Sequence, residues 1–214
     1  SSNPEVATVL NGKITALKPG VTTITAATGI NGDVTATCDV TVRRPEFSLT
    51  GDWSIIRSDP ENWKLNGENS ITITTKPGEY YSNTANAENV FLTPVEGDFT
   101  ATTKLTFVPG ADYQTAGIIV YQDDKNLYGA YKRYHSHFNG NIFTDFALNN
   151  GSASEHTKAD PNKDAAVYLK VVKEGTTFTA YYSYDNSEWV QIADPLNVSG
   201  LTGDLKVGLY AVDG

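Results

Sequence analysis

Residues 99–108 read FTATTKLTFV, and apolar and polar side chains alternate along most of this stretch. A period of two residues is typical of a β-strand with one buried and one exposed face. We therefore predict a strand over Phe99–Val108. Its core-facing side would carry five alternate residues: Phe99, Ala101, Thr103, Leu105 and Phe107.

The rest of the chain has the same texture. Thr, Val, Ile and Tyr recur, and 18 Gly and 9 Pro divide the sequence into short runs, as in all-β proteins. No long window keeps the spacing of an amphipathic helix. Further strands are expected at Val6–Val9, Lys13–Ala16, Val21–Ala26, Val34–Val42, Ser70–Thr75, Gly117–Tyr121, Tyr128–His135, Asn141–Phe146, Ala166–Lys173, Thr176–Ser183, Glu188–Ile192 and Lys206–Val212.

Composition excludes several classes of function. The 214 residues include 16 Lys and Arg against 25 Asp and Glu, for a net charge of −9. Phosphate binding needs clustered cations, and Lys132-Arg133 is the one dense basic run of the large segment, so we expect no nucleic-acid partner. No apolar stretch approaches the ~18 residues of a membrane span. The single Cys38 cannot form an internal disulfide, and the lack of Met suggests a fragment or a processed product.

A domain boundary is predicted near residues 43–46. Residues 1–44 carry a net charge of +1 and no aromatic residue, whereas the remainder carries −10 and all Trp, Tyr and Phe. The polar run Arg43-Arg44-Pro45-Glu46 separates the two textures. We therefore expect one domain over 1–44 and a second over 45–214.

The first segment carries a recognisable motif. SSNPEVATV at 1–9, GKITALKPGVTTITA at 12–26 and CDVTV at 38–42 together resemble the group 2 bacterial immunoglobulin-like domain. In that family the SSNP motif lies in the middle of the domain, so the resemblance implies a partial immunoglobulin-like segment. Such modules serve as spacers or as adhesion segments of surface proteins, and we favour the spacer.

The large segment resembles another family. Its pieces are WSIIRSDPENWKL at 53–65, SITI at 70–73, NVFL at 89–92, GDFTA at 97–101, DYQTAGIIVYQDD at 112–124 and YYSYDNSEW at 181–189. In this order they resemble the concanavalin A-like β-sandwich at the C-terminus of family 43 glycoside hydrolases, related to laminin-G-like carbohydrate-binding modules. The resemblance implies a jelly-roll β-sandwich over 45–214. The family's last strand, expected after Asp213-Gly214, has no match; strands missing at both ends would leave open edges, which predicts strand exchange or further residues.

The sequence lacks the catalytic pattern of glycosidases with this fold. Retaining glycosidases of the concanavalin A-like fold are similar to one another in a Glu-x-Asp-x-x-Glu strand, which places two carboxyl groups on one face. No Glu of this chain starts that pattern, and Glu96-Gly97-Asp98 fails because residue 101 is Ala. His135-Ser136-His137 lacks an adjacent carboxylate cluster, which disfavours a metal site there. We predict a non-catalytic part of a modular glycoside hydrolase.

A sugar-binding surface is predicted around residues 128–138. Sugar recognition uses flat aromatic rings and a few hydrogen-bonding side chains, and this stretch reads YGAYKRYHSHF. Alternation places Tyr131, Arg133, His135 and His137 on one face and Tyr128 on the other. Packing in the sheet is the competing role for each tyrosine. The full candidate set is Tyr113, Gln114, Tyr128, Tyr131, Arg133, His135 and His137.

A structural calcium ion is a separate hypothesis. The resemblance to jelly-roll carbohydrate modules implies one, and calcium takes six to eight oxygen ligands. Five aspartates are available, but their spacing selects none, and a solvated acidic loop is the alternative for each: Asp123, Asp124, Asp160, Asp164 and Asp213.

The leading functional hypothesis is a carbohydrate-binding module of a secreted bacterial enzyme that degrades plant cell-wall polysaccharides. The resemblance implies xylan or arabinoxylan as ligand, the parent catalytic domain as partner, and an extracellular or cell-surface location. Two alternatives stay open. The sandwich could complete the active site of a family 43-like hydrolase without binding sugar alone, or it could be a cell-surface adhesion module.

Overall fold

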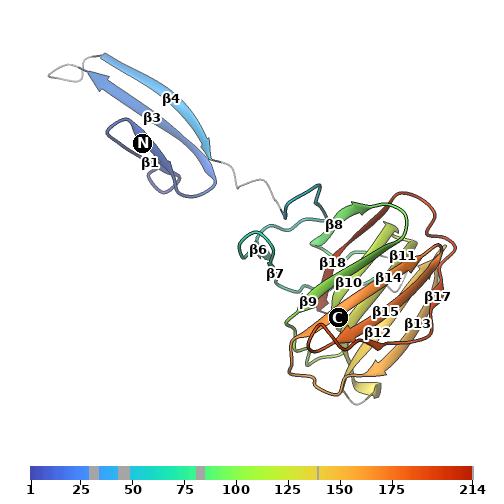
Figure 1. Cartoon of the computed structure of the whole chain (residues 1–214). Helices are drawn as coiled ribbons and strands as arrows, with labels where there is room; N and C mark the ends of the chain where they lie inside the picture. The colour runs from blue at the N-terminus through green and yellow to red at the C-terminus, as the bar shows by residue number, and fades with distance from the viewer. Residues whose placement is uncertain (29–33, 43–48, 81–84, 139, 214) are drawn as a thin grey trace. The chain divides into compact units, whose positions relative to one another are not determined.

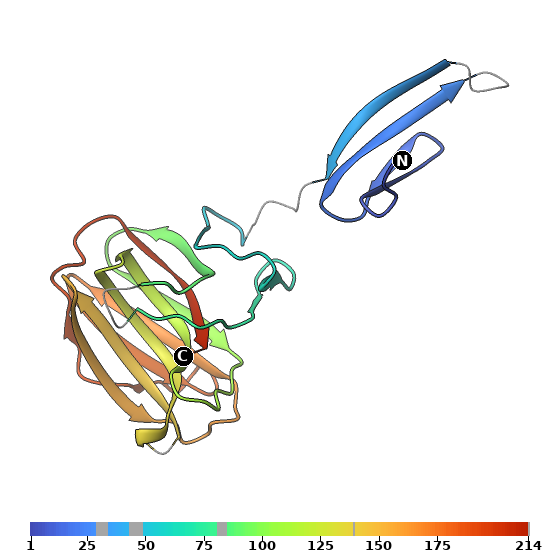
Figure 2. The ribbon, with the colours of Figure 1, turned by 180° about the vertical axis from the view of Figure 1, so that it is seen from behind.

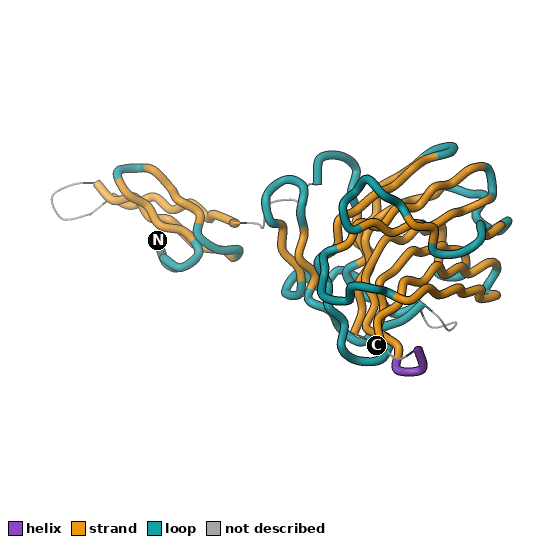
Figure 3. The backbone as a smooth tube through the Cα atoms, turned by 60° about the horizontal axis from the view of Figure 1, so that its bottom comes forward, coloured by secondary structure: helices purple, strands orange, loops and turns teal. Residues whose placement is uncertain are grey.

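The computed structural model describes residues 1–28, 34–42, 49–80, 85–138 and 140–213. The chain divides into two compact units, Ser1–Phe47 and Ser48–Gly214 (Figure 1). The predicted boundary at 43–46 lies outside the described residues. Strands make up most of both units, and the one helical element described is the 3-10 turn η1 (Ser136–Phe138; Figure 3). Within the described part of the chain, no helix is long and apolar enough to cross a membrane.

The first unit consists of two antiparallel hairpins. Strand β1 (Ala7–Leu10) pairs with β2 (Lys13–Ala16), and β3 (Gly20–Thr28) pairs with β4 (Val34–Val42). Asn11 and Gly12 join β1 to β2 with φ of 51° and 77°, the positive values that a two-residue hairpin turn requires. The buried residues described here are few: Val6, Ala7, Thr22 and Ile24. This unit therefore has only a small core.

The second unit is a sandwich of two antiparallel sheets (Figures 1 and 2). The larger sheet has the order β13-β12-β11-β10-β18-β8-β5, and the smaller one has β16-β15-β14-β9 with β17 also paired to β15. A separate hairpin joins β6 to β7. The strand bounds are β5 Ser54–Ile56, β6 Trp63–Leu65, β7 Ile71–Ile73, β8 Val90–Val95, β9 Phe99–Leu105, β10 Gln114–Asp123, β11 Asn126–His135, β12 Gly140–Asn149, β13 Ser152–Ala159, β14 Val167–Glu174, β15 Thr177–Ser183, β16 Val190–Gln191, β17 Leu196–Asn197 and β18 Leu205–Asp213.

The main core lies between the two sheets. Tyr128 of β11 stacks on Phe178 of β15 with ring centres 4.9 Å apart, and Phe143 of β12 stacks on Tyr182 of β15 at 4.1 Å. Both phenylalanines and Tyr128 are fully buried. Because each strand alternates, Tyr128 and Phe143 occupy the inner face of the larger sheet, and their neighbours in sequence occupy its outer face.

A second apolar cluster covers the outer face of the larger sheet. It comprises Tyr80, Ala87, Val90, Leu92, Ile119, Leu127, Tyr131, Phe146, Leu148, Tyr210 and Val212. Tyr80 and Ala87 come from the segment before β8, which lies over the sheet at this point. The larger sheet is therefore apolar on both faces, and the outer one is covered by a chain segment instead of a second sheet.

The structure agrees with the predicted all-β sandwich and adds strands that the sequence did not indicate: β5, β6, β8, β13 and β17. β13 reads SASEHTKA, which lacks the β-branched and aromatic pattern, and Pro94 obscures β8. β18, the last strand described, lies between β10 and β8, and β9 pairs only with β14 among the described strands. The smaller sheet thus has its open edge at β9, and the predicted strand exchange stays a prediction.

Candidate functional site

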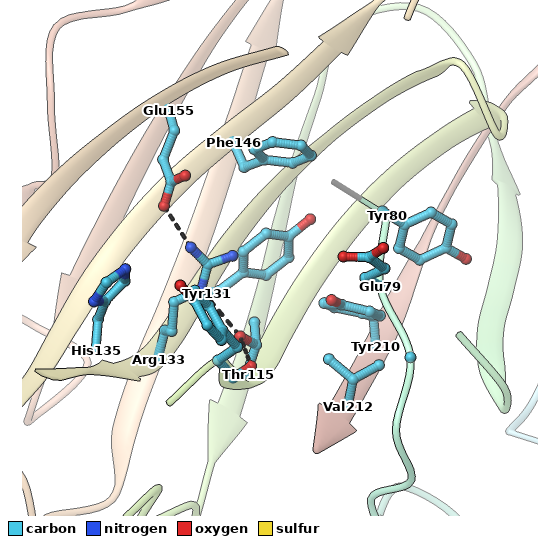
Figure 4. A pocket seen from close by; sticks show the side chains of 12 residues that line it. Glu79, Tyr80, Thr115, Tyr131, Arg133, His135, Phe146, Glu155, Tyr210 and Val212 are labelled. Carbon is cyan, nitrogen blue, oxygen red and sulfur yellow. Dashed lines mark hydrogen bonds and ion pairs between the residues drawn. The ribbon is translucent and has the colours of Figure 1, made fainter. Parts of the chain in front are cut away.

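A pocket of about 390 Å³ lies on the outer face of the larger sheet (Figure 4). The segment Gly78–Tyr80 forms one of its walls. The other lining residues come from five strands and from the turn before β10: Tyr113, Thr115, Tyr131, Arg133, His135, Phe146, Glu155, Tyr210 and Val212. The pocket thus combines aromatic rings with a small number of charged and polar groups, which is the usual composition of a small-molecule site.

Alternation along β11 supplies the central residues. Tyr131, Arg133 and His135 lie two residues apart, so all three side chains project from the same face of the strand. The antiparallel register brings Thr115 of β10 opposite Arg133. Tyr210 of β18 reaches the same region because it pairs with Gly117, which in turn pairs with Tyr131. The sheet therefore gathers residues that are far apart in sequence.

Arg133 is held in a fixed orientation. Its Nε donates to the Thr115 hydroxyl at 3.1 Å, and its Nη1 forms an ion pair with Glu155 of β13. The Arg133 side chain is 11% exposed and that of Glu155 is 23% exposed. A guanidinium carries five N–H donors, so these two contacts leave donors for another group in the pocket. Figure 4 shows the pair beside the aromatic rings.

Tyr131 depends on a glycine of its own strand. A Cβ atom at Gly129, two residues earlier on the same face, would lie 1.8 Å from the Tyr131 hydroxyl oxygen. Only glycine lets this ring lie down along the sheet. Burial raises the pKa of Tyr131 well above its usual value, so the hydroxyl stays protonated. This hydroxyl has no hydrogen-bond partner in the described part of the chain.

The wall over the sheet is held by ionic contacts. Lys76 Nζ lies 2.9 Å from Asp59 and 2.6 Å from Glu88, which ties both ends of the segment together. Arg57 donates to the Tyr80 hydroxyl at 2.7 Å and to the Ala87 carbonyl at 2.6 Å. The hydrogen bond from Lys76 holds the pKa of Asp59 down at about 2. Asp59 therefore stays charged through the neutral and mildly acidic range.

Tyr113 lies at the rim. It is 54% exposed, and its ring centre lies 5.0 Å from that of His135 in an edge-on arrangement. Its φ of 68° is unusual for a non-glycine residue. Its N–H donates to the Tyr134 carbonyl and its own carbonyl accepts from the Thr115 hydroxyl, so the turn is fixed on both sides. An aromatic ring is thus presented to solvent beside the opening.

Four of the seven predicted site residues line this pocket: Tyr113, Tyr131, Arg133 and His135. The prediction for Tyr128 is wrong, because this residue is fully buried between the sheets on the opposite face of β11. Gln114 and His137 are also outside the pocket lining. The Gln114 amide bonds Asp213 and the backbone at Gly110 and Ala111, and His137 lies in η1 beyond the end of β11.

The sequence did not indicate several lining residues, among them Thr115, Phe146, Glu155 and Tyr210. The alternation of β12 places Phe146 on the outer face, and Phe146 pairs with Glu155. Placing Glu155 would have required recognising β13 as a strand. Glu79 and Tyr80 precede β8 in an irregular segment, where no periodicity predicts which side chains face the sheet.

Within the described ranges, no three His, Cys, Asp or Glu side chains converge as metal ligands would. The five aspartates considered for calcium do not meet either. Each has its own partner: Asp123 with Asn126, Asp124 with Arg57, Asp160 with Lys132 and Tyr184, Asp164 with Lys163, and Asp213 with Gln114. The calcium hypothesis stays a prediction, for which the described carboxylates supply no cluster of ligands.

Comparison with solved structures shows the same fold in larger proteins. The GH43 protein BlXynB from Bacillus licheniformis is 19% identical, with a TM-score of 0.67 over 82% of this chain and 37% of that one. A xylan beta-1,4-xylosidase from Bacillus halodurans C-125 is 15% identical, with a TM-score of 0.57 over 82% of this chain and 38% of that one. Bacteroides ovatus Xyloglucan PUL GH43B is 17% identical, with a TM-score of 0.63 over 90% and 47%.

At these identities the likeness shows the fold alone, and the chain spans between a third and a half of the length of these proteins. Among curated protein sequences, none matches this chain. A family model does match, over residues 45–214, and its family is a C-terminal accessory domain and not a catalytic one. The role of the second unit is accordingly a carbohydrate-binding or accessory one. The chain belongs to the family of beta-xylosidase C-terminal concanavalin A-like domains.

Proposed function

We propose that the second unit is a non-catalytic carbohydrate-binding module and that its ligand site is the pocket around Arg133. The observation that carries the proposal is the exposed Tyr113 ring beside His135 and the fixed Arg133–Glu155 pair, in one pocket that the buried Tyr131 and Tyr210 also line. Aromatic rings pack on the apolar face of a pyranose, and charged hydrogen-bonding groups reach its hydroxyls.

The dimensions of the pocket favour a short ligand. Its volume of about 390 Å³ is near the lower end of the range of roughly 300–1,000 Å³ typical of small-molecule pockets. It therefore suits a chain end or a side-branch sugar better than a long run of polymer. We propose xylan or arabinoxylan as the polysaccharide, because the family is named for beta-xylosidases. Affinity should be micromolar to millimolar, since few groups are engaged.

Affinity electrophoresis tests this proposal. The chain is run through native gels that contain arabinoxylan, unsubstituted xylan, cellulose derivative or mannan, and retardation is measured against a gel without polymer. We expect retardation on the xylan-type polymers and its loss in Arg133→Met, which leaves the pocket without its guanidinium. Lys125→Met is the control, because Lys125 is exposed on the turn between β10 and β11. Absence of retardation on every polymer would refute the proposal.

Tyr131→Phe separates binding from stability. The variant removes a buried hydroxyl that has no partner in the described structure, so the free energy of unfolding should stay the same or rise by about 1 kcal/mol. If that hydroxyl bonds a bound sugar, retardation on arabinoxylan should nevertheless fall. A loss of stability in Tyr131→Phe would show instead that the hydroxyl is needed by the fold.

A second candidate function is support of a catalytic domain. It is favoured by the relatives' size, because this fold is only about a third to a half of each GH43 protein compared above. In that case the isolated module would bind no polysaccharide, and deleting it would disable the full-length enzyme. We further propose a bacterial, extracellular or cell-surface location, and a spacer role for the first unit as part of an immunoglobulin-like domain, with adhesion as its alternative.

A further inference from the structure

The outer face of the smaller sheet carries a second group of aromatic and basic residues, remote in the fold from the pocket. On β14 these are Tyr168 and Lys170, on β9 Lys104, on β15 Tyr181, and on the turn after β15 Trp189. The register places Lys104 opposite Tyr168 and Tyr181 opposite Lys170. We call these five residues the lysine–tyrosine face.

The basic and aromatic groups of this face are in contact. Lys170 Nζ lies 4.7 Å from the Tyr181 ring centre and 4.0 Å from that of Trp189. Lys104 Nζ lies 5.4 Å from the Tyr168 ring centre. Such cation–π contacts order the ammonium groups without neutralising them. The three rings and Lys170 are half-buried and Lys104 is exposed, so the face is accessible to solvent.

No described acidic side chain forms an ion pair with Lys104 or Lys170. The other residues that project from the same faces of β9, β14 and β15 are mostly uncharged: Thr100, Thr102, Val172, Thr177, Thr179 and Ser183. Glu174 lies at the far end of β14 from Tyr168, and Asp185 and Glu188 are on the turn that carries Trp189. Lys104 and Lys170 thus give this face two positive charges that no described carboxylate neutralises, in a chain with a net charge of −9.

This combination matches one class of ligand. Rings on a flat sheet can pack against pyranose faces, and the two ammonium groups can pair with carboxylates on the same polymer. Lys104 and Lys170 are diagonal neighbours on the paired strands β9 and β14, a relation in which the backbone positions lie about 7–8 Å apart, so both side chains can reach the same polymer. We infer that the lysine–tyrosine face is a second polysaccharide-binding surface, for a uronate-bearing chain. Binding to this face does not require the pocket around Arg133.

Polygalacturonate is the direct probe, because every unit carries a carboxylate. The full chain is run through gels with polygalacturonate or with neutral arabinoxylan, and dissociation constants are measured by titration. Lys104→Met/Lys170→Met should weaken polygalacturonate binding about fivefold and leave arabinoxylan retardation unchanged. Raising NaCl from about 0.1 to about 1 M shortens the Debye length from about 10 to about 3 Å and should have a similar effect.

The matched control is Lys64→Met/Lys125→Met, which removes the same charge from exposed lysines outside this face. It should bind polygalacturonate as the unchanged chain does. Arg133→Met should also keep this binding, which separates failure of the inference from failure of the pocket proposal. Equal weakening by both double variants would overturn the inference, as would tighter binding of single-stranded oligo(dT) than of polygalacturonate.

Discussion

The two faces of the larger sheet carry similar side chains under different covers. Tyr128 and Tyr131 lie three residues apart on β11 and therefore project from opposite faces. Tyr128 meets a second sheet and stacks on Phe178. Tyr131 meets an irregular segment and lines a pocket of about 390 Å³. A second sheet can cover a face completely because side chains of the two sheets interdigitate, whereas an irregular segment leaves space where its side chains do not reach.

The two faces also differ in the hydrogen-bond partners of their buried polar groups. On the inner face, Asp145 is 1% exposed and is bonded both by His156 at 3.0 Å and by Tyr128 at 3.3 Å. Burial raises the pKa of Asp145, and these partners oppose that effect. On the outer face, the buried Tyr131 hydroxyl has no described partner. The Asp145 carboxylate on the inner face thus has protein partners, whereas the Tyr131 hydroxyl on the outer face has none in the described structure.

The largest expected effect comes from breaking the inner face. Phe178→Ala removes a fully buried ring that stacks on Tyr128, so the free energy of unfolding should fall by about 3–5 kcal/mol. Urea denaturation followed by fluorescence measures this loss. A loss below about 1 kcal/mol would mean that the two sheets are not packed as described.

The outer face can be overfilled through a single methyl group. Gly129→Ala places a Cβ 1.8 Å from the Tyr131 hydroxyl oxygen, so the ring must leave its place along the sheet. We expect a destabilisation of about 1–3 kcal/mol and loss of retardation on arabinoxylan. Adding Tyr131→Leu to Gly129→Ala should recover part of the stability, since the shorter side chain avoids the added methyl. No recovery would place the cause elsewhere than in the ring.

The wall of the pocket should be sensitive to acid. The pKa of Asp59 is about 2 in the folded chain against 3.8 for the free side chain. Its contribution to stability is therefore complete above about pH 4 and is lost as the pH falls towards 2. Lys76→Met removes the largest of the contacts that lower this pKa, so the drop in melting temperature between these pH values should become shallower. If the melting temperature of Lys76→Met dropped between these pH values as much as that of the unchanged chain, this would contradict a role for the Lys76–Asp59 pair.

The smallest effect on stability is expected at the rim. Tyr113→Ala removes a ring that is 54% exposed, so the free energy of unfolding should change by less than about 0.5 kcal/mol. Retardation on arabinoxylan should still decrease, because this ring lines the opening. Denaturation and affinity gels on the same preparation separate the two effects, and full retention of binding would remove Tyr113 from the site.

Part of the site could be predicted from the sequence because it lies on one strand. Alternation alone places Tyr131, Arg133 and His135 together, and the structure has them so. It cannot say which face of the strand will be sealed, which is why Tyr128 entered the candidate set wrongly. Thr115, Glu155 and Tyr210 were beyond its reach, because each joins Arg133 and Tyr131 only through pairing between strands.

The sequence by itself determined that this chain is all-β, where most strands run, and which side chains of a strand share a face. These are local properties, fixed by side-chain branching, turn residues and the two-residue pleat. Only the tertiary structure decided the strand order, the Arg133–Glu155 pair and the cover over each face. Those depend on contacts between residues distant in sequence, and the alternation within one strand contains no information about which strand or segment will pack against it.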